Sequence, residues 1–221
     1  MFETPIIIVN YKTYAPSIGD KAVELTRTIE KNCKKNWAVV PQTADVRAVN
    51  KNTDLSVLSQ HVDAVKPGSN TGHTLLETMI DAGIDGTLIN HSENQLKLSD
   101  IEYIVKRCQE KDIETIVCAN NPDVAASAAA LGPGFVAYEP PELIGGDISV
   151  SSAKPEVVEE AVKKVKDVNK EVKVLCGAGV KDGDDVKAAL DLGTKGVLLA
   201  SGLVKAKNKE EVIKDLENGI L

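Results

Sequence analysis

The chain has 221 residues, of which 43% are hydrophobic and 27% charged. This is the composition of an ordinary globular protein and excludes extensive disorder. Acidic residues outnumber basic ones by 33 to 26, which gives a net charge of −7, so no nucleic-acid partner is expected. The apolar runs are far shorter than the ~20 residues of a membrane span, and the first residues do not resemble a signal peptide. We therefore expect a cytoplasmic protein with no membrane partner.

Short segments rich in Val and Ile recur along the chain, each bounded by Gly, Pro, Asn or Asp. The segments predicted to be strands are 5–10, 37–41, 55–60, 86–91, 113–118, 135–139, 172–176 and 196–200. Their apolar residues are continuous rather than alternating, which is typical of parallel strands buried on both faces.

Segments with helical periodicity lie between the predicted strands. They are predicted to begin near Asp20, Thr71, Ser99, Asn121, Pro155, Asp182 and Asn208, and a shorter helix is predicted over 43–52. Ser99 and Glu102 have the spacing of a capping box. Gly83 and Gly193 stand where helices end in a left-handed conformation.

Strict alternation of strands and helices predicts a parallel sheet with right-handed crossovers. Eight such units favour an α/β fold in which residues 1–221 form a single domain, a closed (β/α)₈ barrel. A doubly wound open sheet is the alternative. We find no linker or shift in composition that would mark a second domain.

Polar side chains follow the predicted strands at their carboxyl ends, where the active site of such a barrel lies. They are Asn10, Lys12, Gln60, Asn90, His91, Glu93 and Glu139. A lysine, a histidine and a glutamate gathered at one end of a barrel indicate proton transfer beside a carbonyl group. Each of these residues alone would more often be a solvated or hydrogen-bonded surface group.

Two further segments indicate how a substrate is held. Residues 176–179 read Cys-Gly-Ala-Gly and residues 200–202 read Ala-Ser-Gly, and such small residues let backbone N–H groups approach a phosphate after the last two strands. Residues 140–152 form an unusually long segment that contains prolines and glycines, which favours a lid. An ordinary surface insertion is the alternative.

The four cysteines and three histidines lack the spacing of a disulfide framework or a metal site. We expect reduced, mostly buried thiols and neither a metal nor a cofactor.

Four parts of the chain, in order, resemble the triosephosphate isomerase family. They are Asn10-Tyr11-Lys12, Asn90-His91-Ser92-Glu93, Ala137-Tyr138-Glu139-Pro140 and the glycines of the last two loops. The short chain and the Cys-Gly-Ala-Gly loop resemble the compact archaeal-type branch. The resemblance covers essentially the whole chain and implies a TIM barrel that interconverts dihydroxyacetone phosphate and D-glyceraldehyde 3-phosphate in glycolysis and gluconeogenesis, without a cofactor.

The resemblance also implies roles for individual residues. Glu139 matches the base that moves the proton and His91 the neutral electrophile, a pairing characteristic of this family. Lys12 matches the cation beside the phosphate and the enediolate. The remaining matches are Asn10 at the oxyanion site, Glu93 beside the lysine, Thr71 reaching a neighbouring subunit's active site, and the N–H groups of Gly145, Ala178, Ala200 and Ser201 on the phosphate.

The lid departs from the usual Ile-Gly-Thr-Gly of the family, because residues 144–147 read Ile-Gly-Gly-Asp. Asp147 adds negative charge near an incoming phosphate, which puts the closing rate and the substrate affinity in question. The alternative, which is the more common outcome for such a residue, is that Asp147 faces solvent. The resemblance implies a homo-oligomer, a dimer or a tetramer with the tetramer favoured. The alternatives to this function are another phosphate-binding barrel enzyme, such as a sugar-phosphate isomerase or synthase, and a non-catalytic barrel that binds a phosphorylated metabolite.

Overall fold

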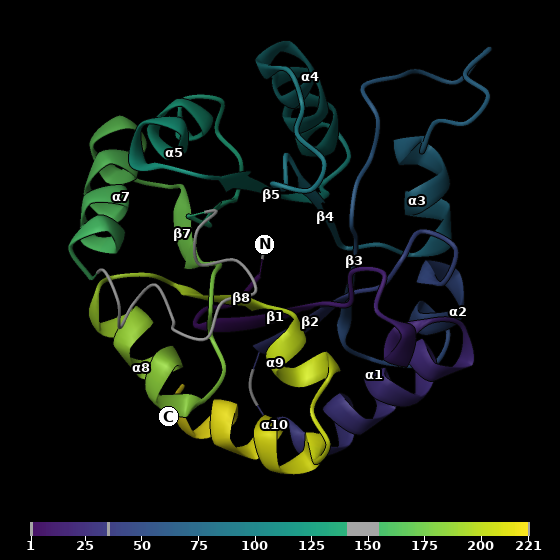
Figure 1. Cartoon of the computed structure of the whole chain (residues 1–221). Helices are drawn as coiled ribbons and strands as arrows, with labels where there is room; N and C mark the ends of the chain where they lie inside the picture. Colours follow the sequence, from purple (N-terminus) through teal and green to yellow (C-terminus); the bar gives the residue numbers. More distant parts are fainter. Residues whose placement is uncertain (1, 35, 141–154, 221) are drawn as a thin grey trace.

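The computed structural model describes residues 2–34, 36–140 and 155–220, and its centre is a closed barrel of eight parallel strands (Figure 1). The strands are β1 Ile6–Asn10, β2 Asn36–Val40, β3 Ser56–Ser59, β4 Gly86–Ile89, β5 Glu114–Ala119, β6 Phe135–Tyr138, β7 Lys173–Cys176 and β8 Gly196–Leu199. Each strand pairs with the next, and β8 pairs with β1 in register from Ile6 to Val9. The predicted strands and the closed barrel are confirmed, and the open sheet is wrong.

Helices surround the barrel on its outer side (Figure 1). They are the short 3₁₀ helix η1 Ala15–Ser17, then α1 Asp20–Asn32, α2 Val46–Asn50, α3 Leu76–Ala82, α4 Leu98–Gln109, α5 Pro122–Ala129, α7 Pro155–Val168, α8 Gly183–Asp191, α9 Ser201–Val204 and α10 Lys209–Asn218. Three predicted starts are confirmed by side-chain caps, because Asn121, Asp182 and Asn208 each accept a hydrogen bond from the backbone N–H three residues later.

One predicted helix start and one predicted capping box are wrong. Helix α4 begins at Leu98 after Lys97, so Ser99 lies inside the first turn and its hydroxyl contacts Asp100 instead of capping the helix. Helix α3 begins at Leu76 and not near Thr71. The intervening residues form a loop instead, closed at its base by backbone hydrogen bonding between Asp63 and Thr74.

Some of the helix ends and short helices were predicted from the sequence, and others were not. Gly83 and Gly193 have φ angles of 95° and 91°, as predicted for helix ends. The helix predicted over 43–52 is confirmed only as the five residues of α2. The short helices η1 and α9 were not predicted, because three or four residues are too few to show a periodicity.

Both faces of the strands are buried, which explains their continuous apolar sequence. Along β1, Ile6 and Ile8 point into the barrel, whereas Ile7 and Val9 pack against the helices. The barrel interior is filled by Ile6, Ile8, Ala38, Val40, Leu58, Leu88, Ile116, Cys118, Phe135, Ala137, Leu175 and Leu198. The barrel is therefore a packed core, and a substrate site must lie at one of its ends.

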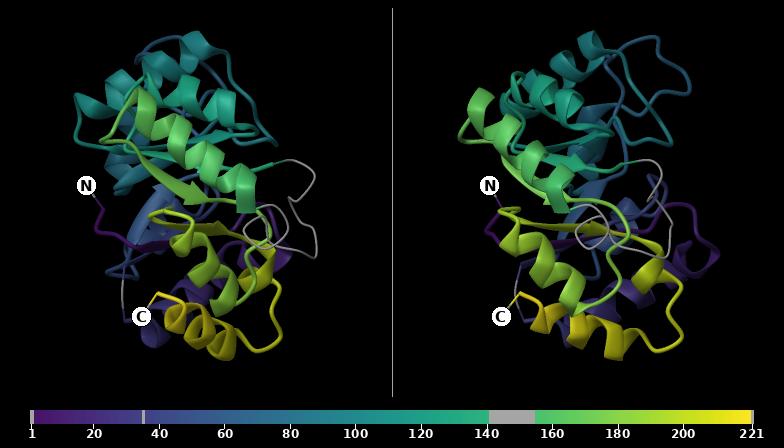
Figure 2. Two further views of the ribbon diagram at one scale, coloured as in Figure 1. Left: turned by 90° about the vertical axis from the view of Figure 1, so that its left-hand side faces the viewer. Right: turned by 60° about the vertical axis from the view of Figure 1, so that its left-hand side comes forward.

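The strands point away from the N-terminus, which lies at the opposite end of the barrel (Figure 2). The loops that follow the strands gather at the carboxyl end, which faces the viewer in Figure 1. None of the helices in the described part of the chain has the length and apolarity needed to cross a membrane.

Candidate active site

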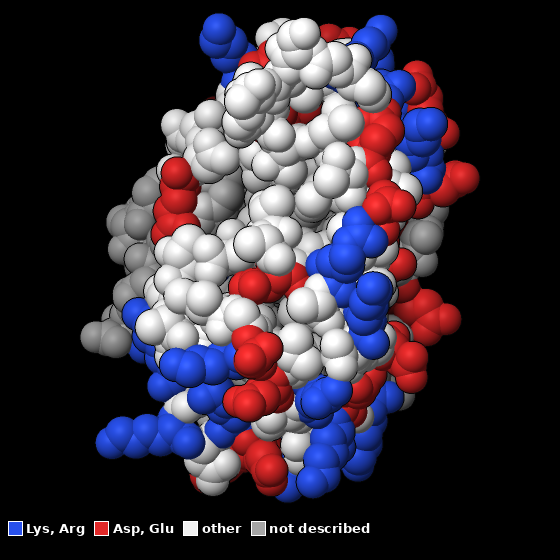
Figure 3. All heavy atoms as spheres, turned by 90° about the vertical axis from the view of Figure 1, so that its right-hand side faces the viewer, with Lys and Arg blue, Asp and Glu red and all other residues white. Residues whose placement is uncertain are grey.

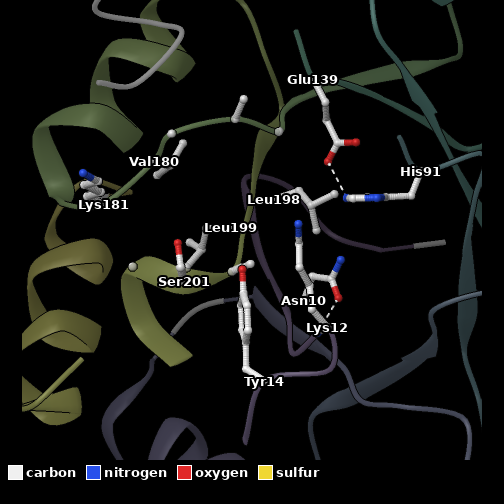
Figure 4. A pocket seen from close by; sticks show the side chains of 15 residues that line it. Asn10, Lys12, Tyr14, His91, Glu139, Val180, Lys181, Leu198, Leu199 and Ser201 are labelled. Carbon is white, nitrogen blue, oxygen red and sulfur yellow. Dashed lines mark hydrogen bonds and ion pairs between the residues drawn. The ribbon is translucent and has the colours of Figure 1, made fainter. Parts of the chain in front are cut away.

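A pocket at the carboxyl end of the barrel brings together residues from β1, β4, β6 and the loops after β7 and β8 (Figure 4). It is lined by Asn10, Lys12, Tyr14, His91, Glu139, Gly177, Ala178, Gly179, Val180, Lys181, Leu198, Leu199, Ala200, Ser201 and Gly202. Seven of the predicted site residues are in this set. The parallel strands bring them together because all their carboxyl ends meet at one edge of the sheet.

The backbone of Lys12 is held in an unusual conformation. Its φ angle is +47°, in the left-handed region that non-glycine residues rarely occupy. Asn10 Oδ1 accepts a hydrogen bond from the Lys12 N–H at 2.9 Å, and Gln60 Nε2 donates to the Lys12 carbonyl at 2.9 Å. Asn10 and Gln60 thus fix the point at which the lysine side chain leaves the barrel rim.

The Lys12 ammonium group lies against a carboxylate from the loop after β4. Its Nζ atom is 2.8 Å from Glu93 Oε1. The Lys12 side chain is 12% exposed and the Glu93 side chain 60% exposed, so the pair lies at the mouth of the pocket. Glu93 therefore holds the ammonium beside the pocket while leaving it positively charged.

Hydrogen bonding defines the protonation of His91. Its Nδ1 atom accepts a hydrogen bond from the backbone N–H of Glu93 at 3.1 Å, so the proton of the neutral ring is on Nε2. Burial, and next the positive charge of Lys12, hold the pKa of His91 below its usual value against the opposing charge of Glu93. His91 is therefore a neutral imidazole that presents an Nε2–H group to the pocket.

Glu139 follows β6 and faces His91 across the pocket. The distance between His91 Nε2 and Glu139 Oε1 is 3.7 Å (Figure 4). Glu139 is only 3% exposed, and its Oε2 atom has no hydrogen-bond partner among the described residues. A buried carboxylate oxygen without a partner is costly, and such a group is available to take a proton from a bound molecule.

The surroundings of Glu139 change its acidity. Burial raises the pKa of Glu139 to about 8; a hydrogen bond with the Cys118 thiol and the charge of Lys12 oppose this rise, and Glu93 adds to it. A base whose pKa lies near neutral pH combines a usable ionised fraction with strong proton affinity. The site thus pairs a strong carboxylate base with a neutral hydrogen-bond donor.

Glycine at position 177 is required by the position of Glu139. A Cβ atom at Gly177 would lie 2.4 Å from Glu139 Cγ. The Gly177 N–H also donates to the Tyr138 carbonyl at 2.9 Å. The first glycine after β7 therefore makes room for the glutamate, in addition to any part it has in an anion site.

The opposite end of the pocket is formed by backbone from the loops after β7 and β8. Ala178 lies on one side, and Ala200 and Ser201 lie on the other. The Ala200 carbonyl accepts the first hydrogen bond of α9, from the Val204 N–H, so the N–H groups of residues 201–203 have no partner within that helix. A short helix after β8 is a recurrent phosphate site in barrels.

Three predicted site residues are not among those that line this pocket, and the first of them, Glu93, contacts Lys12 at its mouth. Thr71 is exposed on the loop between β3 and α3, which extends away from the barrel (Figure 1). Gly145 and the rest of the predicted lid, residues 141–154, lie outside the described residues. None of the four cysteines, all of which are described, forms a disulfide bond, and three of them are buried.

The sequence did not reveal three residues around the site. Tyr14 lines the pocket, Cys118 contacts Glu139, and Gly177 was interpreted only as part of an anion loop. The only feature of the sequence that could have indicated one of them is the position of Tyr14, two residues after Lys12. The contact between Cys118 and Glu139 joins two strands and has no counterpart in local sequence.

Comparison with known proteins agrees with this arrangement. Residues 5–216 match the family model described as triosephosphate isomerase. A triosephosphate isomerase of Methanobrevibacter smithii is 51% identical over 216 residues, which cover 96% of this chain and 97% of that protein. A protein of the same name from Methanocaldococcus jannaschii is 52% identical, and the match covers 96% of this chain and 98% of that protein. Another from Methanobacterium bryantii is 45% identical, and the match covers 99% of this chain and 98% of that protein.

Proposed function

The chain belongs to the triosephosphate isomerase family, and from this premise we propose that Glu139, His91 and Lys12 perform its reaction. The protein is an intramolecular oxidoreductase that interconverts dihydroxyacetone phosphate and D-glyceraldehyde 3-phosphate, a step of glycolysis and gluconeogenesis. We propose that residues 1–221 act as one domain and work in the cytoplasm.

Each of the three residues has a distinct part in the proposed proton transfer. Glu139 takes a proton from C1 of dihydroxyacetone phosphate, and negative charge develops on the oxygen at C2. The Nε2–H group of His91 and the ammonium of Lys12 stabilise this charge. Glu139 returns the proton to C2, and a proton passes from the C1 oxygen to the C2 oxygen, so no atom is gained or lost.

One observation carries this assignment more than any other. A buried carboxylate lies 3.7 Å from an imidazole whose Nδ1 atom already accepts a backbone hydrogen bond. The imidazole can therefore only donate toward the pocket, while the carboxylate, with its raised pKa, is suited to accept. This division between a carboxylate base and a neutral electrophile is the pairing characteristic of the family.

The phosphate group is proposed to bind at the other end of the pocket. Ala178, Ala200 and Ser201 would donate backbone N–H groups, and Asn10 would support the oxyanion site beside Lys12. Gly145 of the proposed lid would add an N–H group when the lid closes and excludes water.

Isomerase activity with phosphate as an inhibitor tests this proposal. Turnover of glyceraldehyde 3-phosphate, coupled to NADH oxidation by glycerol-3-phosphate dehydrogenase, is expected to be fast. Inorganic phosphate should raise the apparent KM and leave kcat unchanged, because it occupies the site of the substrate's phosphate group. Absence of inhibition at tens of millimolar phosphate would contradict the anion site, and sulfate serves as a second probe of the same charge.

We further propose that the protein is a homo-oligomer, with a tetramer favoured over a dimer. The loop that carries Thr71 extends from the barrel, and the carboxylate of Asp63 holds its base by contacts with His61, His73 and the Thr74 N–H. Beside the charged side chains at the edge and bottom of this face lies a broad uncharged area (Figure 3). Such a surface suits contact with a second copy, in which Thr71 would approach the neighbour's pocket.

A second exposed feature supports assembly beyond a dimer. Leu98 at the start of α4 is 59% exposed, as expected for an apolar side chain that contacts another subunit. Light scattering after size-exclusion chromatography is expected to give the mass of four chains, and Leu98→Glu the mass of two. A wild-type protein that runs as a monomer at micromolar concentration would contradict this proposal.

A further inference from the structure

The side chain of Tyr14 enters the pocket from the segment after β1. Tyr14 lines the same pocket as Glu139, His91 and Ser201. Figure 4 shows its ring standing beside Asn10 and Lys12, with the hydroxyl pointing toward the start of α9 near Ser201. The hydroxyl therefore faces the end of the pocket where the phosphate is proposed to bind, away from the base and the electrophile.

The ring of Tyr14 is in contact with the side chain of Lys205. Lys205 Nζ lies 4.0 Å from the ring centroid, in the position of a cation–π contact. Lys205 directly follows α9, the helix that begins at Ser201. The contact thus joins the segment after β1 to the segment after β8, which are the two walls of this end of the pocket.

The backbone of Tyr14 is fixed as well. Its carbonyl accepts hydrogen bonds from the N–H and from the hydroxyl of Ser17, at 2.9 and 3.0 Å. The Ser17 hydroxyl also contacts the Tyr11 carbonyl at 3.0 Å, and Ser17 is fully buried. A tyrosine on such a tight turn loses little further freedom when a ligand binds.

The Tyr14 hydroxyl makes no hydrogen bond with the residues that the structure describes. The hydroxyl of the buried Tyr11, in contrast, lies 2.7 Å from the Thr26 hydroxyl. A rigid donor that points into an anion pocket without a protein partner is positioned for a ligand, because a hydrogen bond from a neutral donor to a charged oxygen is among the stronger ones.

We propose that Tyr14 is a phosphate-binding residue, whose hydroxyl donates a hydrogen bond to a phosphate oxygen of the substrate, and that Lys205 is the positioning residue that holds its ring. This inference rests on the proposed function of the pocket and adds a side-chain donor to its backbone donors. Lys205 also places a positive charge next to the ring, which favours a dianion in a chain of net charge −7.

Phosphate binding measured by calorimetry, together with steady-state kinetics, tests the inference. Tyr14→Phe keeps the ring and its contact with Lys205 and removes only the hydroxyl. We expect phosphate to bind about tenfold more weakly and KM to rise about tenfold, which corresponds to a free energy of ~1.4 kcal/mol. The kcat value should stay within about twofold of wild type, because the hydroxyl faces away from the reacting carbons.

Two matched variants serve as controls. Tyr103→Phe removes a hydroxyl that is buried without a partner in the described part of the chain, and Tyr103 does not line this pocket. It should leave phosphate affinity and both kinetic constants unchanged.

The role of Lys205 is tested in the same way. Lys205→Met should weaken phosphate binding by about two- to threefold. Its control is Lys207→Met, which removes an exposed charge two residues later and should have a smaller effect.

The outcomes separate this inference from the proposed function. A phosphate affinity that is equal in wild type and Tyr14→Phe would overturn the inference, as would a lowered kcat at unchanged KM or a wild-type protein that binds no phosphate. A wild-type protein that binds phosphate through Tyr14 but turns over no triose phosphate would contradict the proposed function and leave the inference supported.

Discussion

Glu139→Gln is expected to lower kcat by about three orders of magnitude, because an amide cannot take the proton that the carboxylate takes. General-base catalysis typically contributes ~10²- to 10⁴-fold, and the side chain keeps its size and its neighbours in this variant. The measurement is steady-state turnover of glyceraldehyde 3-phosphate. A kcat value of the variant within tenfold of wild type would contradict the assignment of Glu139 as the base.

The pH dependence of the wild type provides a second readout for the same residue. Because burial raises the pKa of Glu139 to about 8, the ionised form is scarce at pH 6, and kcat/KM should rise with pH up to about 8. The pKa of His91 is held below its usual value, so the rise in kcat/KM between pH 7 and 8 reports the ionisation of Glu139. The rise should be absent from the residual activity of Glu139→Gln.

Stability should change in the direction opposite to activity. The folded-state pKa of this acid lies above its ordinary value of 4.5, so folding favours the protonated form and stability is lost as pH rises from about 4.5 through about 8. Glutamine does not ionise and avoids this cost. The Tm of Glu139→Gln at pH 8 is expected to be at least as high as that of wild type, and a markedly lower Tm would show that the variant disturbs the fold.

Lys12→Met is expected to raise KM beyond the millimolar range and to lower kcat/KM at least ~10³-fold. The variant keeps an unbranched, flexible side chain but removes the ammonium that lies 2.8 Å from Glu93 Oε1 at the mouth of the pocket. This charge is proposed to stabilise both the phosphate and the enediolate oxygen, so its loss affects binding and the transition state together. A variant that retains a micromolar KM would contradict the proposed role of Lys12 in binding the phosphate.

The loss of the Lys12 charge should also shift the pH profile. Lys12 lowers the pKa of both Glu139 and His91, so both values should rise in its absence, and the rise in kcat/KM should move to higher pH. Lys21→Met is the matched control, because Lys21 is an exposed lysine on α1 that does not line this pocket. It should leave KM and the pH profile as in wild type.

Much of this fold could be predicted from local sequence. The eight continuous apolar segments and their alternation with helices required only short-range patterns, and the helix starts at Asn121, Asp182 and Asn208 depend on groups three residues apart. The start of α3 was predicted wrongly, and the capping box predicted at Ser99 does not form. The proline and glycine residues before α3 and the polar turn before α4 are each compatible with several helix start positions. Only packing in the folded chain selects one of these positions.

Local sequence is enough to predict which residues end the strands, and hence that a lysine, a histidine and a glutamate share one rim of the barrel. The chemical state of these three groups depends on contacts that form only in the folded chain. Lys12 and Glu93 are 81 residues apart in the chain, the space for Glu139 depends on Gly177, and the raised pKa of Glu139 arises from burial by several strands. The orientation of Tyr14 likewise depends on Lys205. Secondary structure follows from neighbours along the chain, whereas distance, burial and electric field depend on groups that only the closed barrel brings together.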